Sequence, residues 1–519
     1  MPIENPHFKP LVLIVLDGVG IAPTSAGNAV TKASTPFLEQ VWDSHPHTML
    51  YASGAHVGLP NAIKGNSEVG HMNMGSGRVV FQDLPRINRA IDRGAFANNQ
   101  IILDAFSRAE KNKTTLHTAV CFSDAGVHGT INHLEALLAL AQKIQFTRPL
   151  VIHAFTDGRD SPPRSAATFL TIIQDTIDET GMGIIGSIMG RYYAMDRNRV
   201  WDRVEKAYIA LTEGSPHICG SWKQAIDEAY QRGENDEFIN PTTISSEKFS
   251  DPCIKDGDSF IFLNYRSDRS IELTSAFILP EFNLFPRKVY LENLHFVGMT
   301  QYAKAIPRNV AFPADDITMT LGRVLAENDQ RQLRIAESEK FPHVTYFFNG
   351  GRSIKFQGED RIEIASPNVP TYDLKPEMSL PLVTQTILNK ISLRVYDFIL
   401  INCANGDMVG HTGVFDAGIK AMITVDKAVE QIVSATQSIG GAVIITADHG
   451  NVEEMINLKT QKIDTEHSNN PVPFVFIPPR SVTNKLTLPQ GALADVAPTV
   501  LSIMGINKPS EMTGKDLVS

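Results

Sequence analysis

Three apolar runs decide the fold: LVLIVLDG (residues 11–18), FILINCANGD (398–407) and AVIITADHG (442–450). Continuous runs of this length are typical of strands that are buried on both faces of a parallel sheet. Each run leads into an aspartate, and sites in open α/β sheets form at the carboxyl ends of strands. If the three runs share one sheet, a single domain is built from both ends of the chain.

The middle of the chain repeats this pattern with different endings. Four more apolar runs pass into polar loops, in residues 115–124, 149–160, 184–193 and 259–269. Between them, INHLEALLALAQKI (131–144) places apolar residues at helical spacing, which predicts a helix that packs one face on a sheet. The alternation predicts a second α/β domain.

Prolines mark the expected domain boundaries, with Pro85 on one side and Pro307 and Pro313 on the other. We therefore expect an inserted domain at residues 85–312. The remaining residues, 1–84 and 313–519, would form one discontinuous domain. The sequence contains no internal repeat or low-complexity tract.

Composition excludes several classes of protein. The chain has 519 residues, 43% of them hydrophobic and 20% charged, which excludes a disordered or fibrous protein. Its formal net charge of −10 argues against general nucleic-acid binding. The four cysteines are widely spread, so we expect neither a disulfide scaffold nor a thiolate zinc ribbon, and we expect a reducing compartment.

The ends of the chain show no targeting pattern. The amino-terminal segment is polar, and the apolar run at residues 11–16 is far shorter than the ~20 residues of a membrane span. We expect a soluble cytoplasmic protein with no membrane association.

Histidines and aspartates near the three apolar runs are candidate metal ligands. Mixed carboxylate and imidazole ligands suit borderline divalent ions such as zinc or manganese. Taken singly, each residue could instead be a turn residue, a helix cap or an ordinary histidine. The candidates are Asp17, Asp407, His411, Asp448, His449 and His467.

Spacing adds some geometry to these candidates. Asp407 and His411 are four residues apart and would share a helix face, but Gly410 favours a loop there. Asp448 and His449 are adjacent and would point to opposite faces of a strand. Both can bind one ion only if the strand ends at them, and the glycine that follows permits such a turn.

Ser67 lies in GNSEVGHMNMG (residues 65–75) and has two interpretations. Ser67 or Asn66 could be a helix N-cap, with Glu68 in the first turn. Alternatively, a serine hydroxyl beside a divalent metal can lose its proton and act as a nucleophile, and a helix amino end also favours phosphate. The pattern is not a GxSxG elbow, which disfavours an α/β-hydrolase.

Arginines recur in the polar loops of the middle domain. Because guanidinium binds phosphate and carboxylate bidentately, their convergence would predict a site for a small, multiply charged anion. Scattered surface ion pairs are the alternative. Lys340 could be another phosphate contact or a solvated side chain. The residues of this predicted site are His128, Arg159, Asp160, Arg191, Arg197, Arg266 and Arg269.

Together these motifs resemble the cofactor-independent (2,3-bisphosphoglycerate-independent) phosphoglycerate mutase family, along nearly the whole chain. The resemblance rests on VLDGVG, GNSEVGHMNMGSGRVVFQDLPRIN, SDAGVHG, DGRDSPPRSA, GRYYAMDRNRVWDRV, NYRSDR, EKFPHVTYFFNGG, NGDMVGHTG, ADHGNVEEM and EHSNNPVPF. It implies an alkaline-phosphatase-like domain with a largely parallel sheet, interrupted by an inserted transferase domain that binds the substrate.

The resemblance also implies roles for single residues. One divalent ion, most often manganese in this family, would be held by Asp17, Ser67, Asp448 and His449. A second ion would be held by Asp407, His411 and His467. The inserted domain would supply the substrate contacts named above, and Lys340 would hold the phosphate near the metals. Departures are few: Ala125, Gly129, Tyr265, Ser267 and Glu466 stand where the family commonly has other residues.

The expected reaction interconverts 3-phosphoglycerate and 2-phosphoglycerate through phosphoserine at Ser67. Asp160 is the candidate general acid or base, and closure of one domain on the other would exclude water. The resemblance implies a monomer whose partner is the small-molecule substrate. A phosphomonoesterase or sulfatase, a phosphopentomutase and a non-enzymatic anion-binding or metal-storage protein remain as alternatives.

Overall fold

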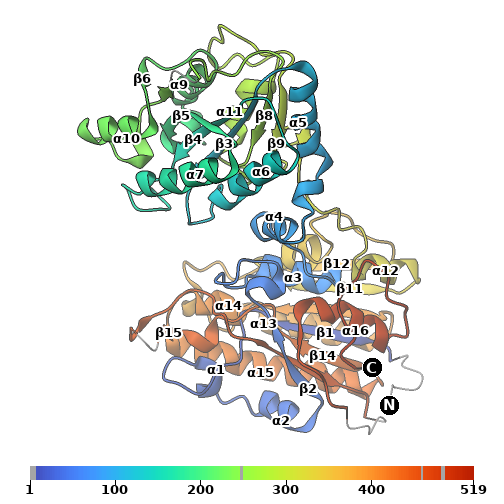
Figure 1. Ribbon diagram of the computed structural model, residues 1–519. Coiled ribbons are helices and arrows are strands. Elements are labelled where there is room, and N and C mark those ends of the chain that lie inside the picture. The colour runs from blue at the N-terminus through green and yellow to red at the C-terminus, as the bar shows by residue number, and fades with distance from the viewer. Residues whose placement is uncertain (1–7, 246–248, 458–459, 481–485, 519) are drawn as a thin grey trace. The chain divides into compact units, whose positions relative to one another are not determined.

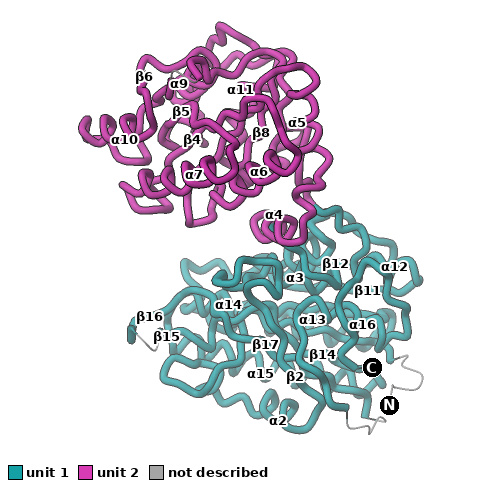
Figure 2. The backbone as a smooth tube through the Cα atoms, viewed as in Figure 1, with its two compact units in different colours: residues 1–82, 315–519 teal, residues 83–314 magenta. Residues whose placement is uncertain are grey.

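The computed structural model describes residues 8–245, 249–457, 460–480 and 486–518. The backbone divides into two compact units, residues 1–82 with 315–519 (unit 1) and residues 83–314 (unit 2) (Figure 2). The predicted boundaries lie within a few residues of this division. Metal binding by unit 1 and substrate binding by unit 2 stay predictions.

Unit 1 is built on a mixed sheet in the order β12-β11-β13-β1-β14-β17-β2-β18. Figure 1 labels β1, β2, β11, β12 and β14 of this sheet. The first five strands of this order run parallel to one another, and β17 pairs antiparallel with both β14 and β2. The strands are β1 (Leu11–Leu16), β2 (His47–Tyr51), β11 (Gln332–Glu337), β12 (Glu359–Ile364), β13 (Phe398–Cys403), β14 (Ala442–Thr446), β17 (Val472–Ile477) and β18 (Gly491–Ala492).

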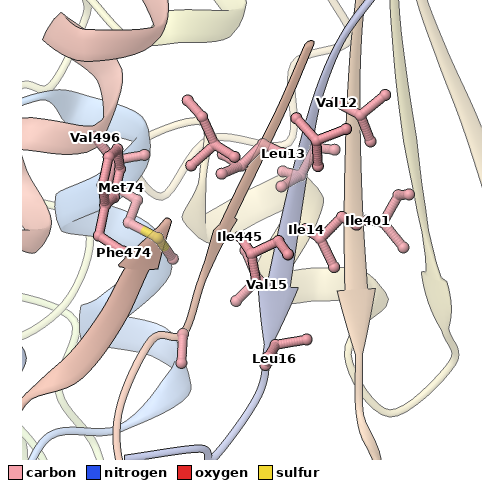
Figure 3. Close-up of a cluster of buried hydrophobic side chains, with 14 of the residues drawn as sticks. Val12, Leu13, Ile14, Val15, Leu16, Met74, Ile401, Ile445, Phe474 and Val496 are labelled. Carbon is pink, nitrogen blue, oxygen red and sulfur yellow. The ribbon is translucent and has the colours of Figure 1, made fainter. Parts of the chain in front are cut away.

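The three apolar runs share this sheet, as predicted. β1 lies between β13 and β14, with Leu11 opposite both Phe398 and Ala442. Every residue of β1 is buried, so both faces of the strand are covered. Figure 3 shows its side chains packed among those of neighbouring strands and helices. The start of the chain and its last quarter therefore contribute to one core.

Helices cover this sheet and carry several candidate site residues. The α-helices of unit 1 are α1 (Ala29–Lys32), α2 (Pro36–Ser44), α3 (Ser67–Ser76), α12 (Leu321–Glu327), α13 (Leu380–Ser392), α14 (Asn405–Gly410), α15 (Phe415–Ser438) and α16 (Val496–Ile503). A short helix, η6 (Val452–Glu454), follows β14, and a small ladder pairs β15 (Ile456–Asn457) with β16 (Lys462–Ile463).

Unit 2 has its own sheet, in the order β10-β9-β8-β3-β4-β5-β7-β6. Neighbouring strands are parallel except for β5 and β7. The strands are β3 (Leu116–Phe122), β4 (Leu150–Thr156), β5 (Ile184–Gly190), β6 (His217–Cys219), β7 (Thr242–Ile244), β8 (Ser259–Phe262), β9 (His295–Gly298) and β10 (Asn309–Val310). The four predicted strands of the middle region are β3, β4, β5 and β8, which confirms a second α/β fold.

The predicted helix at residues 131–144 is confirmed as α6 (Ile131–Lys143), whose apolar face is buried. The other α-helices of unit 2 are α4 (Asp83–Asp92), α5 (Gln100–Asn112), α7 (Ala166–Thr180), α8 (Arg191–Ala194), α9 (Trp201–Thr212), α10 (Trp222–Gln231) and α11 (Ile271–Ile278). In the part of the chain that the structure describes, no helix is both long and apolar enough to cross a membrane.

The first and last segments of unit 2 are joined to each other. Arg86 of α4 donates to the Phe312 carbonyl at 2.9 Å and to the Pro313 carbonyl. Asn99, which caps α5, donates to the Ala311 carbonyl at 2.7 Å. The chain therefore enters and leaves unit 2 at neighbouring points.

A buried histidine should make the stability of unit 2 depend on pH. His133 of α6 is fully buried, its Nε2 lies 2.9 Å from Asn88 Oδ1, and burial lowers its pKa to about 3. The unfolded chain binds a proton below pH ~6.5 that the folded protein excludes, so stability falls as the pH falls from there.

The free energy of unfolding of the wild type should fall between pH 7 and pH 5. We predict that this fall is about 2 kcal/mol smaller in His133→Gln, since glutamine still donates to Asn88 but does not titrate. Urea unfolding followed by the fluorescence of Trp201 and Trp222, both in unit 2, measures this. His217→Gln, at an exposed position of the same unit, is the control. Equal pH dependence in His133→Gln and the wild type would contradict the prediction.

Candidate active site

Three strand-end aspartates meet at one edge of the unit 1 sheet. Asp17 follows β1, Asp407 lies beyond β13, and Asp448 lies beyond β14. All three are buried, and the Asp407 amide donates to the Asp17 carbonyl at 2.9 Å. Possible ligand atoms of Asp17, Asp407 and His449 lie within 4.8 Å of one another. The carboxyl-edge rule therefore predicted their convergence correctly.

The preference for a loop at residues 407–411 is wrong. Asp407 lies in α14 and His411 is its C-terminal cap, so the two side chains share a face, with Oδ1 and Nε2 3.2 Å apart. Gly410 serves close packing: a Cβ there would come within 2.4 Å of Asn451 Oδ1. β14 ends at Thr446, so Asp448 and His449 lie beyond the strand and need not point to opposite faces of the sheet. The hypothesis that both residues bind one metal ion required this.

Ser67 is the first residue of α3, and Asn66 is its N-cap, accepting a hydrogen bond from the Val69 amide at 2.9 Å. The capping role therefore belongs to Asn66, which leaves the Ser67 hydroxyl for other contacts. Ser67 Oγ donates to Asp17 Oδ1 at 3.2 Å and lies 2.9 Å from His449 Nε2. The hydroxyl thus points into the aspartate cluster.

Lys340, in the loop after β11, is buried in the same cluster rather than solvated. Its Nζ lies 2.7 Å from Asp17 Oδ1 and 2.6 Å from Asp407 Oδ2, and it donates to Ser67 Oγ at 2.7 Å. Burial alone would lower the pKa of Lys340, but the two carboxylates raise it above its usual value. Lys340 is therefore a fixed cation beside the hydroxyl.

The pKa values of the buried Asp17 and Asp407 shift in opposite directions. Burial and the nearby Asp448 raise the pKa of Asp17, although Lys340 opposes the shift. Burial also acts to raise the pKa of Asp407, but Lys340 and the neighbouring histidines hold it well below its usual value. Asp407 is therefore ionised at neutral pH.

His411 and His467 converge on Asp407. Their Nε2 atoms lie 3.0 Å apart, and each is 3.2 Å from Asp407 Oδ1. The Nδ1 of His411 donates to the Thr465 carbonyl at 2.7 Å, and the Nδ1 of His467 donates to the Gly65 carbonyl at 2.7 Å. Carbonyl partners on Nδ1 orient both Nε2 atoms inward, as is usual for metal-ligating histidines. The hydrogen bond with Asp407 raises the pKa of His411.

These residues fit divalent ions. The set of Asp407, His411 and His467 places one carboxylate oxygen and two imidazole nitrogens together. Near Asp17, the buried Asp448 Oδ2 lies 3.2 Å from His71 Nδ1, and possible ligand atoms of Asp17, His71 and Asp448 lie within 4.8 Å of one another. A donor set of carboxylate, imidazole and hydroxyl suits borderline divalent ions.

A groove of about 640 Å³ reaches His411 and His467 from the surface. Lys64 and Glu466 also line it, and their side chains pair with each other at 2.9 Å. The departure from the family pattern at Glu466 is therefore balanced by a lysine.

Two residues of this cluster were missed. Buried His71 lies 3.2 Å from Asp448 Oδ2 through Nδ1, and it is four residues after Ser67 on the same helix, a spacing that could have revealed it. Asn402 donates to Asp17 Oδ2 at 2.7 Å and lies 3.2 Å from His71 Nε2. Asn402 could have been found from the sequence because it is the one amide side chain in the otherwise apolar strand β13.

In unit 2, Arg191 is the buried centre of the predicted anion site. Its Nη1 contacts Asp157 Oδ1 at 2.6 Å and Asp160 Oδ2 at 2.5 Å, and its Nη2 donates to His128 Nε2 at 2.8 Å. Burial and the nearby arginines lower the pKa of His128 to about 4. Neutral His128 then keeps a proton on Nδ1, which is buried without a partner and is available to a ligand.

The other arginines surround this centre. Asp268 pairs with Arg197 at 2.8 Å and with Arg266 at 2.9 Å, and Arg269 donates to the Met195 carbonyl at 2.9 Å. Burial and then the charges of Arg191, Arg197 and Arg159 lower the pKa of Arg269. Arg159 is more exposed and reaches Glu237 at 3.6 Å. Asp157, which also caps the loop of Arg159 and Asp160, was missed despite its place directly after β4.

Comparisons with known proteins agree with these features. A family model described as the metalloenzyme superfamily matches residues 9–508. The 2,3-bisphosphoglycerate-independent phosphoglycerate mutase of Ectopseudomonas mendocina (strain ymp) is 46% identical over 511 residues, 98% of each chain. That of Nitrosococcus oceani is 45% identical, again over 98% of each chain. A solved Leishmania mexicana phosphoglycerate mutase, crystallised at low cobalt concentration, is 30% identical with a TM-score of 0.57, covering 100% of this chain and 99% of that one.

We predict that Lys340→Met destabilises the metal-free protein by about 3–5 kcal/mol, because it leaves buried carboxylates without their cation. Added Mn²⁺ should then raise the melting temperature more than it does in the wild type. Lys64→Met, which breaks a surface pair, is the control and should cost at most about 1 kcal/mol. Equal losses in the two variants, measured by thermal unfolding in a chelator, would contradict the prediction.

Proposed function

The chain belongs to the 2,3-bisphosphoglycerate-independent phosphoglycerate mutase family of the metalloenzyme superfamily, and we propose that it catalyses phosphoryl transfer through Ser67. As a member it is an isomerase that interconverts 3-phosphoglycerate and 2-phosphoglycerate, a step of glycolysis and gluconeogenesis, without a bisphosphoglycerate cofactor. The observation that supports a role for Ser67 is its hydroxyl, which is buried between Lys340, Asp17 and His449.

In the proposed reaction, Ser67 Oγ attacks phosphorus, and the bond from phosphorus to the 3-oxygen of the substrate breaks. Ser67 gives up its hydroxyl proton in this step, and the freed 3-oxygen takes up one proton, so the two changes balance. The 2-hydroxyl then loses a proton and attacks the phosphoserine, the bond from phosphorus to Oγ breaks, and Ser67 regains a proton. Lys340, 2.7 Å from Ser67 Oγ, would neutralise phosphoryl oxygen during both transfers.

We assign one metal ion to Asp17, Ser67, Asp448 and His449, and a second to Asp407, His411 and His467. The fit rests on the clustered ligand atoms. When bound, divalent ions supply Lewis acidity that lowers the pKa of the serine hydroxyl and balances phosphoryl charge. Manganese is our proposal for the ion, because carboxylate and imidazole ligands suit it.

We assign the glycerate to unit 2. Arg191 and its neighbours Arg159, Arg197, Arg266 and Arg269 would bind the carboxylate and phosphate groups, since guanidinium matches both bidentately. His128 would donate from Nδ1. A hydrogen bond from Arg191 keeps the pKa of Asp160 low against the effect of burial, so Asp160 is ionised and able to accept a proton from a substrate hydroxyl.

A phosphomonoesterase is the competing function for unit 1, because water could complete the reaction at the same serine. The clustered arginines of unit 2 favour the mutase, since hydrolysis has no need to retain the alcohol. We further propose a monomeric, cytoplasmic enzyme. Four buried free thiols, Cys121, Cys219, Cys253 and Cys403, support a reducing compartment.

We predict that Ser67→Ala lowers mutase turnover at least about 1,000-fold, because no other group can carry the phosphoryl between the two oxygens. Conversion of 3-phosphoglycerate is measured together with phosphate release. Ser76→Ala, the same change in the same helix away from the cluster, is the control and should retain turnover. Normal turnover in Ser67→Ala would reject the serine mechanism, and phosphate release at the turnover rate would favour the phosphatase.

We also predict that dialysis against a chelator abolishes turnover and that Mn²⁺ restores it. The physical reason is that the serine hydroxyl keeps its proton at neutral pH without a nearby divalent cation. Metal content is measured in parallel by plasma mass spectrometry, and Co²⁺, Zn²⁺ and Mg²⁺ are compared at equal concentration. Full turnover of a protein with less than a tenth of an equivalent of metal would contradict the assignment.

A further inference from the structure

Glu453 is a buried carboxylate outside the proposed ligand set. It lies in η6, directly after the loop that carries Asp448 and His449, and its side chain is 1% exposed. Four hydrogen bonds reach its two oxygens, all from neutral donors. A buried charge is costly unless it is satisfied in this way, so the arrangement calls for an explanation.

Oε2 of Glu453 joins two loops that carry proposed ligands. It accepts from the Gly20 amide at 2.8 Å and from the Asn451 amide at 2.9 Å. Gly20 lies in the loop that begins with Asp17. The same two loops also meet where the Gly18 amide donates to Asp448 Oδ1 at 3.2 Å. Oε2 thus holds the loop of Asp17 against that of Asp448 and His449.

Oε1 joins a third loop. It accepts from the Ser468 hydroxyl and from Asn470 Nδ2 at 3.0 Å. Ser468 directly follows His467, and its amide donates to the Gly450 carbonyl at 2.9 Å. The position of His467, a ligand proposed for the second ion, therefore depends on the same carboxylate.

Two glycines make room for this carboxylate. A Cβ at Gly20 would lie 2.4 Å from Glu453 Oε1, and a Cβ at Gly450 would lie 2.3 Å from the same atom. Both loops therefore approach the carboxylate more closely than any residue with a side chain would allow. Because of this close packing, a shift of the Glu453 carboxylate would also shift the two loops that carry the proposed ligands.

We propose that Glu453 is a positioning residue that holds the three loops of Asp17, of Asp448 with His449, and of His467 in the geometry that binds the metal ions. The inference rests on the proposed metal centre and adds the group that organises it. Asn451 links Glu453 to a further proposed ligand, because its backbone amide donates to Glu453 and its Nδ2 donates to Asp407 Oδ1 at 3.0 Å. Residues that orient metal ligands typically contribute 10- to 100-fold to metal affinity.

Glu453→Gln tests the proposal, because it keeps the shape but turns one acceptor into a donor. An amide nitrogen would face either the amides of Gly20 and Asn451 or the donors on Ser468 and Asn470. Either way, about half of the bonds are lost. Glu454→Gln is the matched control: it removes the same charge from the same short helix, and Glu454 accepts from Asn470 at 3.1 Å.

The measurement is Mn²⁺ binding to the metal-stripped full chain, by titration calorimetry and by the electron paramagnetic resonance signal of free Mn²⁺. We expect Glu453→Gln to weaken Mn²⁺ binding by about 10- to 100-fold. Glu454→Gln should change it less than about threefold. Far-ultraviolet circular dichroism of the metal-free proteins shows whether each variant is folded.

Unchanged Mn²⁺ affinity in folded Glu453→Gln would overturn the proposal, as would an equal loss in Glu454→Gln, which would indicate a simple charge effect. If Glu453→Gln does not fold, Ser468→Ala decides: it removes one donor and keeps the carboxylate, and unchanged affinity there would overturn the proposal. Failure of the wild type to bind Mn²⁺ would instead reject the metal centre itself, so the two failures are distinguishable.

Discussion

The site in unit 1 depends on the electrostatic problem of three buried carboxylates at one sheet edge. Asp17, Asp407 and Asp448 are almost fully excluded from water, and burial of like charges at such distances is unfavourable. Cations must therefore occupy the same small space. Lys340 supplies one positive charge, and the convergent histidines offer nitrogen ligands to further cations. The need for compensation explains both the buried lysine and the fitness of the cluster for divalent ions.

This edge exists only because remote parts of the chain share one sheet. β1 is the central strand, and its two neighbours come from the last quarter of the sequence, after the whole of unit 2. The loops after β1 and β14 and the helix α14 after β13 bring Asp17, Asp448 and Asp407 together. Contacts of such long sequence separation slow folding. The same strand pairings build the core of unit 1 and bring its candidate ligands together.

Much of this organisation could be predicted because it follows from short-range patterns. Continuous apolar runs identified β1, β13 and β14, and the carboxyl-edge rule brought their aspartates together. Glycines misled where their role was packing: Gly410 suggested a loop, yet it lies in a helix and makes room for Asn451. The burial of Lys340 could not be read from its surroundings, because the partners that hold it are distant in sequence. His71, Asn402 and Glu453 were missed for a related reason, since each contacts a residue that is distant in sequence: Asp448, Asp17 and Gly20, respectively.

The joining of the first and last segments of unit 2 has an evolutionary consequence. Arg86 bonds to the carbonyls of residues 312 and 313, so a segment of more than two hundred residues begins and ends at nearly one point. A host fold can accept such a segment in a surface loop at little entropic cost, since its own loop ends scarcely move apart. The phosphatase-like scaffold could thus acquire a whole second domain by a single genetic insertion, without rebuilding its core.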